Sequence, residues 1–206
     1  MLVKPGADWR SNRREAARVD ILGQAWTLAR ENGLLGFSLR ELARRLGMAA
    51  PSLYSYFDSK HALYDTMFAD GYRAFLALDR PPGSDLRSEL LAGARRFAEF
   101  SQADPVRYQL MFQRTIPGFE PTPSSYALAQ EAYERDFAPL RAFGLTSQRH
   151  LDLVTGVISG LVAQQLANEP DSDRWLRLLD EAVDMLVHHL STAVTTNRPT
   201  TSGARS

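Results

Sequence analysis

The sequence predicts an all-α fold, with a small N-terminal domain followed by a larger helical C-terminal domain. Three observations favour this fold class. Apolar residues recur at helical spacing along most of the 206 residues. No long segment alternates apolar and polar residues strictly, as a half-buried strand would. β-Branched residues, which strands prefer, are sparse outside residues 154–158.

The first predicted helix covers residues 13–32, where the apolar stripe stops at an Asn-Gly pair, a common end of a helix. Ser38 is the expected N-cap of a short second helix, and Glu41 stands three residues later, as in a capping box. That helix ends at Gly47, which permits a tight turn. A third helix is expected over about 50–57. Asp58 or Ser59 then caps a longer helix that ends near residue 78.

The segment DRPPGSD, residues 79–85, breaks any helix and is the clearest boundary in the chain. Further helices are expected at about 84–102, 105–115, 124–142, 147–168 and 172–194. We therefore expect one small domain over 10–60, a helical domain over 61–196 and a polar, disordered tail over 197–206.

Charge is distributed unevenly although it sums to zero. Residues 1–60 hold 10 basic and 6 acidic side chains, or 10 − 6 = +4, whereas residues 61–206 hold 14 basic and 18 acidic ones, or 14 − 18 = −4. A basic N-terminal part indicates a polyanionic partner, with chance scatter as the alternative.

The chain has no cysteine, which excludes disulfides and cysteine-based metal sites.

Residues 38–63 have the pattern of a helix-turn-helix. Leu39, Leu42, Ala43 and Leu46 share one face of the first short helix. Pro51 suits the first turn of the next helix, and Leu53 and Phe57 are spaced to anchor it. The opposite face then carries Ser52, Ser55 and Tyr56, which are short or hydroxyl-bearing side chains. One buried face and one such face are what a recognition helix in a major groove requires.

This segment resembles the DNA-binding domain of the TetR/AcrR family of bacterial regulators. That family has Thr or Ser, then LRELA, a Gly, a short turn, a hydroxyl residue followed by LYxYF, a Ser-Lys pair and a Leu. The positions that fit are Ser38, Leu39, Leu42, Ala43, Gly47, Ser52, Leu53, Tyr54, Tyr56, Phe57, Ser59, Lys60 and Leu63. The resemblance covers residues 13–65. Beyond it only the helical layout is similar, and residues 104–123 resemble a C-terminal subtype found in actinobacterial members.

The resemblance implies an interface with double-stranded operator DNA. Its expected residues are Ser38, Arg40, Ala49, Ala50, Pro51, Ser52, Tyr54, Ser55, Tyr56 and Lys60. Tyr54, Tyr56 and Lys60 are expected on phosphates, while Ala49 and Ala50 offer a base only an apolar contact. The alternatives are that the tyrosines are core aromatics and that Lys60 is a solvated cap residue.

Arginines outside this set are further candidates for DNA contacts. Arg44 can supply a contact, or it can belong to a solvated helix face together with Arg45. Arg10, Arg13 and Arg14 can reach an adjacent minor groove, or they can form a solubilising tail.

Family members bind a small-molecule effector in the C-terminal domain and form homodimers through their last two long helices. An aromatic set suits an apolar effector, with ordinary core packing as the alternative: Phe97, Phe100, Tyr108, Met111, Phe112, Phe119, Tyr126, Tyr133 and Phe137. The dimer helices are expected at about 147–168 and 172–194. The first has small residues at Gly156, Ser159, Gly160 and Ala163, and the second has apolar residues at Trp175, Leu178, Leu179, Ala182, Val183, Leu186 and Leu190. These helices can equally pack within one subunit.

No catalytic motif is present, and the adjacent His188 and His189 make a poor metal pair. We expect neither enzymatic activity nor a metal or other cofactor. No signal peptide or membrane helix is indicated, so a cytoplasmic protein is expected. The resulting hypothesis is a homodimeric, effector-released repressor. The rival hypothesis is a helix-turn-helix used only for protein contacts.

Overall fold

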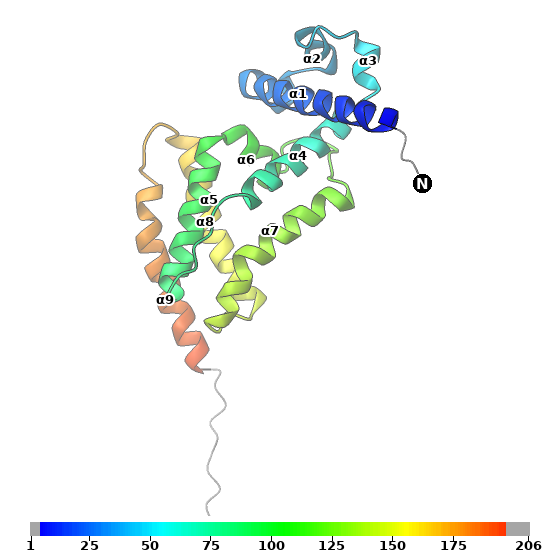
Figure 1. Cartoon of the computed structure of the whole chain (residues 1–206). Helices are drawn as coiled ribbons and strands as arrows, with labels where there is room; N and C mark the ends of the chain where they lie inside the picture. Colours follow the sequence, from blue (N-terminus) through cyan, green and yellow to red (C-terminus); the bar gives the residue numbers. More distant parts are fainter. Residues whose placement is uncertain (1–4, 197–206) are drawn as a thin grey trace, which may run out of the picture. The chain divides into compact units, whose positions relative to one another are not determined.

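The computed structural model describes residues 5–196, with backbone only at residues 5–8, 10, 11 and 192–196. The described chain is helical and holds no strand, which confirms the all-α prediction. Two compact units are present (Figure 1). The first comprises Met1–Ala77 and Asp104–Gln130, and the second Leu78–Ala103 and Glu131–Ser206, each within its described part. The functional division expected at residue 60 stays a prediction, and the predicted tail over 197–206 lies outside the described residues.

The first unit contains the predicted helix-turn-helix. Its helices are α1 (Pro5–Gly36), α2 (Leu39–Arg45), α3 (Ala50–Tyr54), α4 (Lys60–Leu76), α6 (Pro105–Phe112) and the beginning of α7 (Pro123–Ala142). Helix α1 begins earlier than expected, and its regular part ends as predicted because Gly33 has φ 74°. Gly47, after α2, has φ 63°. A side chain would be strained at both glycines, so these residues define where the chain turns.

Hydroxyl side chains begin α2 and α4, the two helices that flank residues 50–57, which we call the recognition segment. Ser38 Oγ accepts from the backbone N–H of Glu41 at 3.1 Å, which confirms Ser38 as the N-cap of α2. The Glu41 carboxylate pairs with Arg44 instead of returning to Ser38, so no reciprocal half of a capping box is seen. Ser59 Oγ accepts from the N–H of Ala62 at 3.0 Å, which selects Ser59 over Asp58 as the cap of α4.

Partly buried polar contacts connect α1, α4 and α6. The Trp26 indole donates to Asp70 at 2.8 Å, and the Arg30 guanidinium pairs with Asp104 at 2.7 Å. Asp104 is also the N-cap of α6, where it accepts from the N–H of Arg107 at 3.1 Å. These bonds fix how the helices pack around the apolar core, in which Ile21, Leu28 and Met67 are at most 1% exposed.

The second unit packs α5 (Leu86–Ala103), α8 (Gln148–Asn168) and α9 (Leu179–Thr196) together with the end of α7. Figure 1 shows α5, α8 and α9 side by side. The prediction that the last helix begins at 172 is wrong. Residues 171–175 instead turn around the buried Gln165, whose amide donates to Ser172 O at 2.7 Å and accepts from Trp175 N at 2.9 Å. A short 3₁₀ turn, Leu176–Leu178, then leads into α9.

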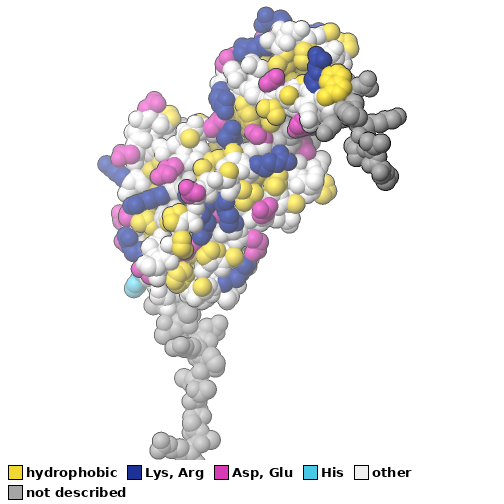
Figure 2. All heavy atoms as spheres, in the orientation of Figure 1, with side chains coloured by type: hydrophobic (Ala, Val, Ile, Leu, Met, Phe, Trp, Pro, Cys, Tyr) yellow, Lys and Arg dark blue, Asp and Glu magenta, His cyan; other side chains and the backbone are white. Residues whose placement is uncertain are grey.

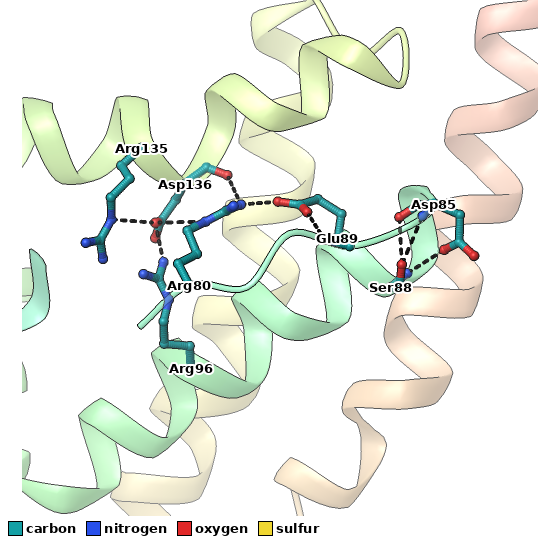
Figure 3. A network of polar contacts seen from close by, with 8 residues as sticks. Arg80, Asp85, Ser88, Glu89, Arg96, Arg135 and Asp136 are labelled. Carbon is teal, nitrogen blue, oxygen red and sulfur yellow. Dashed lines mark hydrogen bonds and ion pairs between the residues drawn. The ribbon is translucent and has the colours of Figure 1, made fainter. Parts of the chain in front are cut away.

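A mostly buried ionic network joins the linker, α5 and α7 within the second unit (Figure 3). Arg80 pairs with Glu89, and its guanidinium also donates to the Asp136 carbonyl at 3.2 Å. The Asp136 carboxylate pairs with Arg96 and lies 3.9 Å from Arg135 Nε. Burial lowers the pKa of Arg135, and the neighbouring Arg96 charge adds to this effect.

Two other kinds of feature, a membrane-spanning helix and a metal-binding cluster, are absent from the described residues. No helix there combines the length and the apolar character that crossing a bilayer requires. The described side chains also form no group of three His, Cys, Asp or Glu residues suited to a metal ion.

Candidate nucleic-acid interface and ligand cavity

Helix α3 has two different faces. Leu53 is fully buried and Phe57, just beyond the helix, is 2% exposed, so they anchor the segment as the sequence indicates. The outward residues Ala49, Pro51, Ser52, Tyr54 and Ser55 are exposed, while Ala50 and Tyr56 are half-buried. The outer surface is therefore made of small, hydroxyl and phenolic side chains that allow close approach to a groove.

The hydroxyl groups of this surface differ in their availability. Ser55 Oγ donates to the Ser52 carbonyl at 2.6 Å, and Ser38 Oγ is occupied by its capping bond. Tyr54 is 50% exposed, which leaves its ring and hydroxyl open to solvent. Of the expected phosphate ligands, Tyr54 is thus the most accessible.

Lys60, at the start of α4, folds back on the protein. Its ammonium donates to the Leu35 carbonyl at 3.2 Å and lies 4.7 Å from the centre of the Phe37 ring and 5.3 Å from that of Tyr64. Burial lowers the pKa of Lys60. The lysine keeps further N–H donors for a phosphate, because an ammonium has three.

Arginines surround α2, and Figure 2 shows dark blue spheres over this helix at the top of the view. Arg44 pairs with Glu41 at 2.6 Å and Arg45 pairs with Glu31. Arg40 is exposed, and no ion pair or hydrogen bond of its side chain is found in the described part of the chain. Arg40 is therefore the arginine of α2 that is least committed to the protein itself.

The N-terminal arginines of α1 differ from one another. Arg13 and Arg14 are both exposed, but Arg14 donates to the Ser55 carbonyl at 2.9 Å and lies over the Tyr56 ring. The side chain of Arg10 lies outside the described residues. The expected minor-groove arm thus includes one arginine, Arg14, that binds the recognition segment.

A cavity of about 370 Å³ lies within the first unit, between α4, α6, the loop 113–122 and the beginning of α7. Its size falls in the lower part of the range of small-molecule sites. Its walls are rich in aromatic rings and its rim is polar: Phe68, Tyr72, Leu110, Met111, Phe112, Gln113, Arg114, Ile116, Phe119, Glu120, Pro121, Tyr126 and Ala129. Burial raises the pKa of Tyr72, whose hydroxyl donates to the Met111 carbonyl at 3.3 Å.

The cavity brings together four of the expected effector residues, Met111, Phe112, Phe119 and Tyr126. Tyr108 packs behind it, with its ring centre 5.7 Å from that of Phe112. Phe97, Phe100, Tyr133 and Phe137 belong to the second unit and do not line this cavity, and Tyr133 and Phe137 contact each other at 4.5 Å.

Sequence reasoning missed the wall that α4 contributes, Phe68 and Tyr72. Their spacing of four residues places both on one helix face, a signal that was available. The spacing predicts that the two rings share a helix face, but it does not predict that this face lines a cavity.

The cavity wall is attached to the first two turns of α4. The Phe119 ring lies 6.1 Å from His61 and 5.8 Å from Tyr64, measured between ring centres. Asp65 accepts hydrogen bonds from Thr122 N at 2.7 Å and from Ser125 Oγ at 2.8 Å. The loop that closes the cavity is therefore fastened to the helix that follows α3.

The expected dimer helices have unequal surfaces. On α9 the apolar residues Leu179, Val183, Leu186 and Leu190 are buried within the second unit. On α8, Gly156 and Gly160 are exposed, and a Cβ at either would meet no atom within 4 Å. Leu153 and Met185 are exposed apolar side chains, at 37% and 58%. The open surface of the two helices thus includes the glycines of α8 and the exposed Leu153 and Met185.

Comparison with known proteins agrees with this geometry. The sequence profile described as "Bacterial regulatory proteins, tetR family" matches residues 21–67, which contain the second half of α1, all of α2 and α3, and α4 as far as Met67. The HTH-type transcriptional regulator Rv1816 of Mycobacterium tuberculosis is 28% identical over 127 residues, covering 57% of this chain and 54% of the relative. The chain thus spans about half the length of the curated relatives it matches.

Solved structures share the fold over most of the chain. SCO0253, a TetR-family regulator from Streptomyces coelicolor, has a TM-score of 0.57 at 24% identity and covers 91% of this chain and 98% of its own. A TetR variant from Acinetobacter baumannii AYE, in complex with minocycline, also has a TM-score of 0.57, at 21% identity, with 90% and 98% covered.

The fold and the two-faced α3 define a helix-turn-helix protein. Residues 21–67 thus match the tetR family of bacterial regulatory proteins, and the curated relatives that are 28% identical to this chain are HTH-type transcriptional regulators.

Proposed function

We propose that this protein binds double-stranded operator DNA through α3 and represses transcription until an effector releases it. The observation that carries DNA binding is the outer face of α3, where small and hydroxyl side chains lie over the buried Leu53. Tyr54, Tyr56 and Lys60 contact phosphates and fix the register of the protein on the duplex. Ser38 and Arg40 add contacts at the start of α2.

Base readout is weak in this proposal. Ala49, Ala50 and Pro51 offer methyl or ring contacts to thymine, and Ser52 and Ser55 offer hydroxyls. Binding is therefore dominated by phosphate contacts and is steeply dependent on salt.

We also propose that a small apolar or aromatic effector occupies the cavity of the first unit. The lining rings Phe68, Tyr72, Phe112 and Phe119 suit such a molecule, and Gln113, Arg114 and Glu120 supply polar anchors at its rim. A relative of the same fold is described with minocycline bound, an aromatic small molecule. The effector acts by favouring a state in which α4 is shifted, since only differential affinity for two states moves an equilibrium.

The proposed assembly is a homodimer through α8 and α9. The exposed glycines of α8 allow two helices to approach closely, and Leu153 and Met185 add apolar area. Two-fold symmetry would place two α3 helices on half-sites about 34–36 Å apart, or a multiple of that. Because its partner is genomic DNA, we place the protein in the cytoplasm.

The test of DNA binding is selection of duplexes from a random pool with the full-length protein. Recovery of a palindromic sequence supports the proposal. Recovery of no duplex at low salt contradicts it and favours the rival function, in which the helix-turn-helix contacts proteins. The effector proposal fails separately if the protein binds DNA but no compound of an aromatic library changes its affinity for the selected duplex.

A further inference from the structure

Two arginines of α1 lie over two consecutive rings at the end of the helix-turn-helix. The Arg14 guanidinium carbon is 5.7 Å from the centre of the Tyr56 ring, and that of Arg18 is 5.1 Å from the centre of the Phe57 ring. Residues four apart share a helix face, so both arginines project from α1 toward the same short segment. All of these residues lie in the first unit.

Arg14 also binds the backbone at the end of α3. Its Nη2 donates to the carbonyl of Ser55, the C-cap residue, at 2.9 Å. The last carbonyls of a helix lack partners within the helix, and a cation beside them is favourable. A planar guanidinium can satisfy such a carbonyl and cover an aromatic ring together, which a lysine ammonium does less well.

Helix α3 has few other local constraints. It is 5 residues long, and its N-cap Ala49 provides no side-chain hydrogen bond. A helix this short has little intrinsic stability in water. Its orientation therefore depends on packing against other elements. Leu53 of α3 and the following Phe57 are buried in the core, and Arg14 of α1 binds the end of α3 at the solvent side.

We propose that Arg14 is a positioning residue that orients Tyr56 for its phosphate contact and does not itself bind DNA. The inference rests on the proposed role of Tyr56 in DNA binding. Arg14 holds the phenol ring and the Ser55 carbonyl of one segment, while Arg18 holds the adjacent Phe57 ring. Part of the positive charge of the N-terminal region thus orients the recognition segment and does not contact phosphates.

The experiment is a double-mutant cycle with full-length protein and a duplex recovered by selection, measured over a series of salt concentrations. The variants are Arg14→Ala, Tyr56→Phe and the double variant. Tyr56→Phe keeps the ring for the guanidinium and removes the hydroxyl that faces the phosphate. We expect Arg14→Ala to weaken binding about five- to tenfold, from the lost stacking and charge-assisted bond, and Tyr56→Phe to weaken it by about the same factor, from the lost hydrogen bond to the phosphate. We expect the double variant to bind the duplex about as weakly as the more affected of the two single variants, because Arg14 acts through Tyr56.

Salt dependence separates positioning from direct contact. A phosphate contact by a cation contributes about 0.9 to the slope of log affinity against log salt. We expect Arg14→Ala to leave this slope unchanged and Arg14→Lys, which keeps the charge, to recover little of the lost affinity. The control is Arg13→Ala, which removes an exposed charge from the adjacent position of α1.

Thermal unfolding verifies that each variant is folded. If Arg14→Ala is not folded, Arg14→Lys replaces it in the cycle. Additive losses in the cycle, a slope reduced by about one, or full recovery by Arg14→Lys would overturn the inference while leaving DNA binding intact. Wild-type protein that binds no duplex would instead refute the proposed function, and the inference with it.

Discussion

The Phe119 ring packs against the Tyr64 ring, with centres 5.8 Å apart and planes at 66°. The Tyr64 hydroxyl in turn donates to the carbonyl of Leu34, which follows the Gly33 kink at the end of α1. A residue of the cavity wall is therefore one ring away from the helix-turn-helix, and both lie in the same compact unit. An occupant that moves Phe119 can act on the start of α4 by direct packing.

Phe119→Ala should uncouple the effector from DNA. The variant keeps most of the cavity wall but loses the ring that contacts His61 and Tyr64. We expect the ratio of duplex affinities without and with effector to fall about tenfold, within the range of typical coupling energies. Fluorescence anisotropy with labelled duplex measures the ratio. The control is Phe112→Ala, whose ring packs on Tyr72 and Tyr108, and which should weaken effector binding with coupling retained.

Tyr54→Phe should weaken DNA binding about three- to tenfold on every duplex, because a phosphate contact carries no sequence information. Tyr54 is half-exposed, so removing its hydroxyl should leave the fold intact. The matched control is Tyr126→Phe, at an equally exposed tyrosine of the cavity rim. Repeating the selection with Tyr54→Phe verifies the role, and an altered consensus sequence would contradict it.

Ser59→Ala should destabilise the first unit by about 1 kcal/mol, the usual cost of losing an N-cap. Asp58→Ala should change the free energy of unfolding by less than about 0.5 kcal/mol, as an ordinary surface substitution does. The difference follows from the bond that Ser59 accepts from Ala62 N at 3.0 Å. Urea unfolding of the two variants compares them directly. Equal losses would show that the cap is shared.

Local rules predicted much of the first unit. Gly33 and Gly47 mark turns because positive φ is costly for other residues, and Ser38 marks a helix start because its hydroxyl reaches the N–H of Glu41. Leu53 and Phe57 follow from helical spacing. Each of these features depends on residues within a few positions of one another.

Long-range packing accounts for what the sequence did not disclose. The start of α9 depends on Gln165, which is buried on α8 and binds the turn before that helix. The grouping of Phe119 with Phe68 in one cavity, apart from Phe97, depends on tertiary contacts between α4 and the loop 113–122. The bond from Arg14 to Ser55 spans 41 positions, and no sequence spacing signals it.

Asp136→Ala should destabilise the second unit by about 3–5 kcal/mol, the cost of breaking a buried ion pair. It leaves Arg80, Arg96 and Arg135 beside one another with Glu89 as the remaining carboxylate of the network (Figure 3). The control is Glu134→Ala, on the same helix, whose pair with Arg141 is exposed and should contribute at most about 1 kcal/mol. Denaturant unfolding measures both. If the two variants lost similar free energies of unfolding, the ionic network would not be buried in solution.

Gly160→Leu should weaken the homodimer while making the subunit itself no less stable. A Cβ at Gly160 meets no atom within 4 Å, so the subunit accepts a side chain there. Replacing a helical glycine by leucine favours the helix by about 0.5–1 kcal/mol. The same side chain would separate two α8 helices that approach each other at this position, so the dissociation constant of the dimer should rise at least tenfold in sedimentation equilibrium.

The control for this prediction is Gly23→Leu, at an exposed glycine of α1 that is equally open and gains the same helix propensity. It should raise thermal stability without changing self-association. The two variants differ only in whether their new side chain lies on the proposed dimer surface. A Gly160→Leu protein that dimerises as tightly as the wild type would therefore place the subunit contact elsewhere than along the glycines of α8.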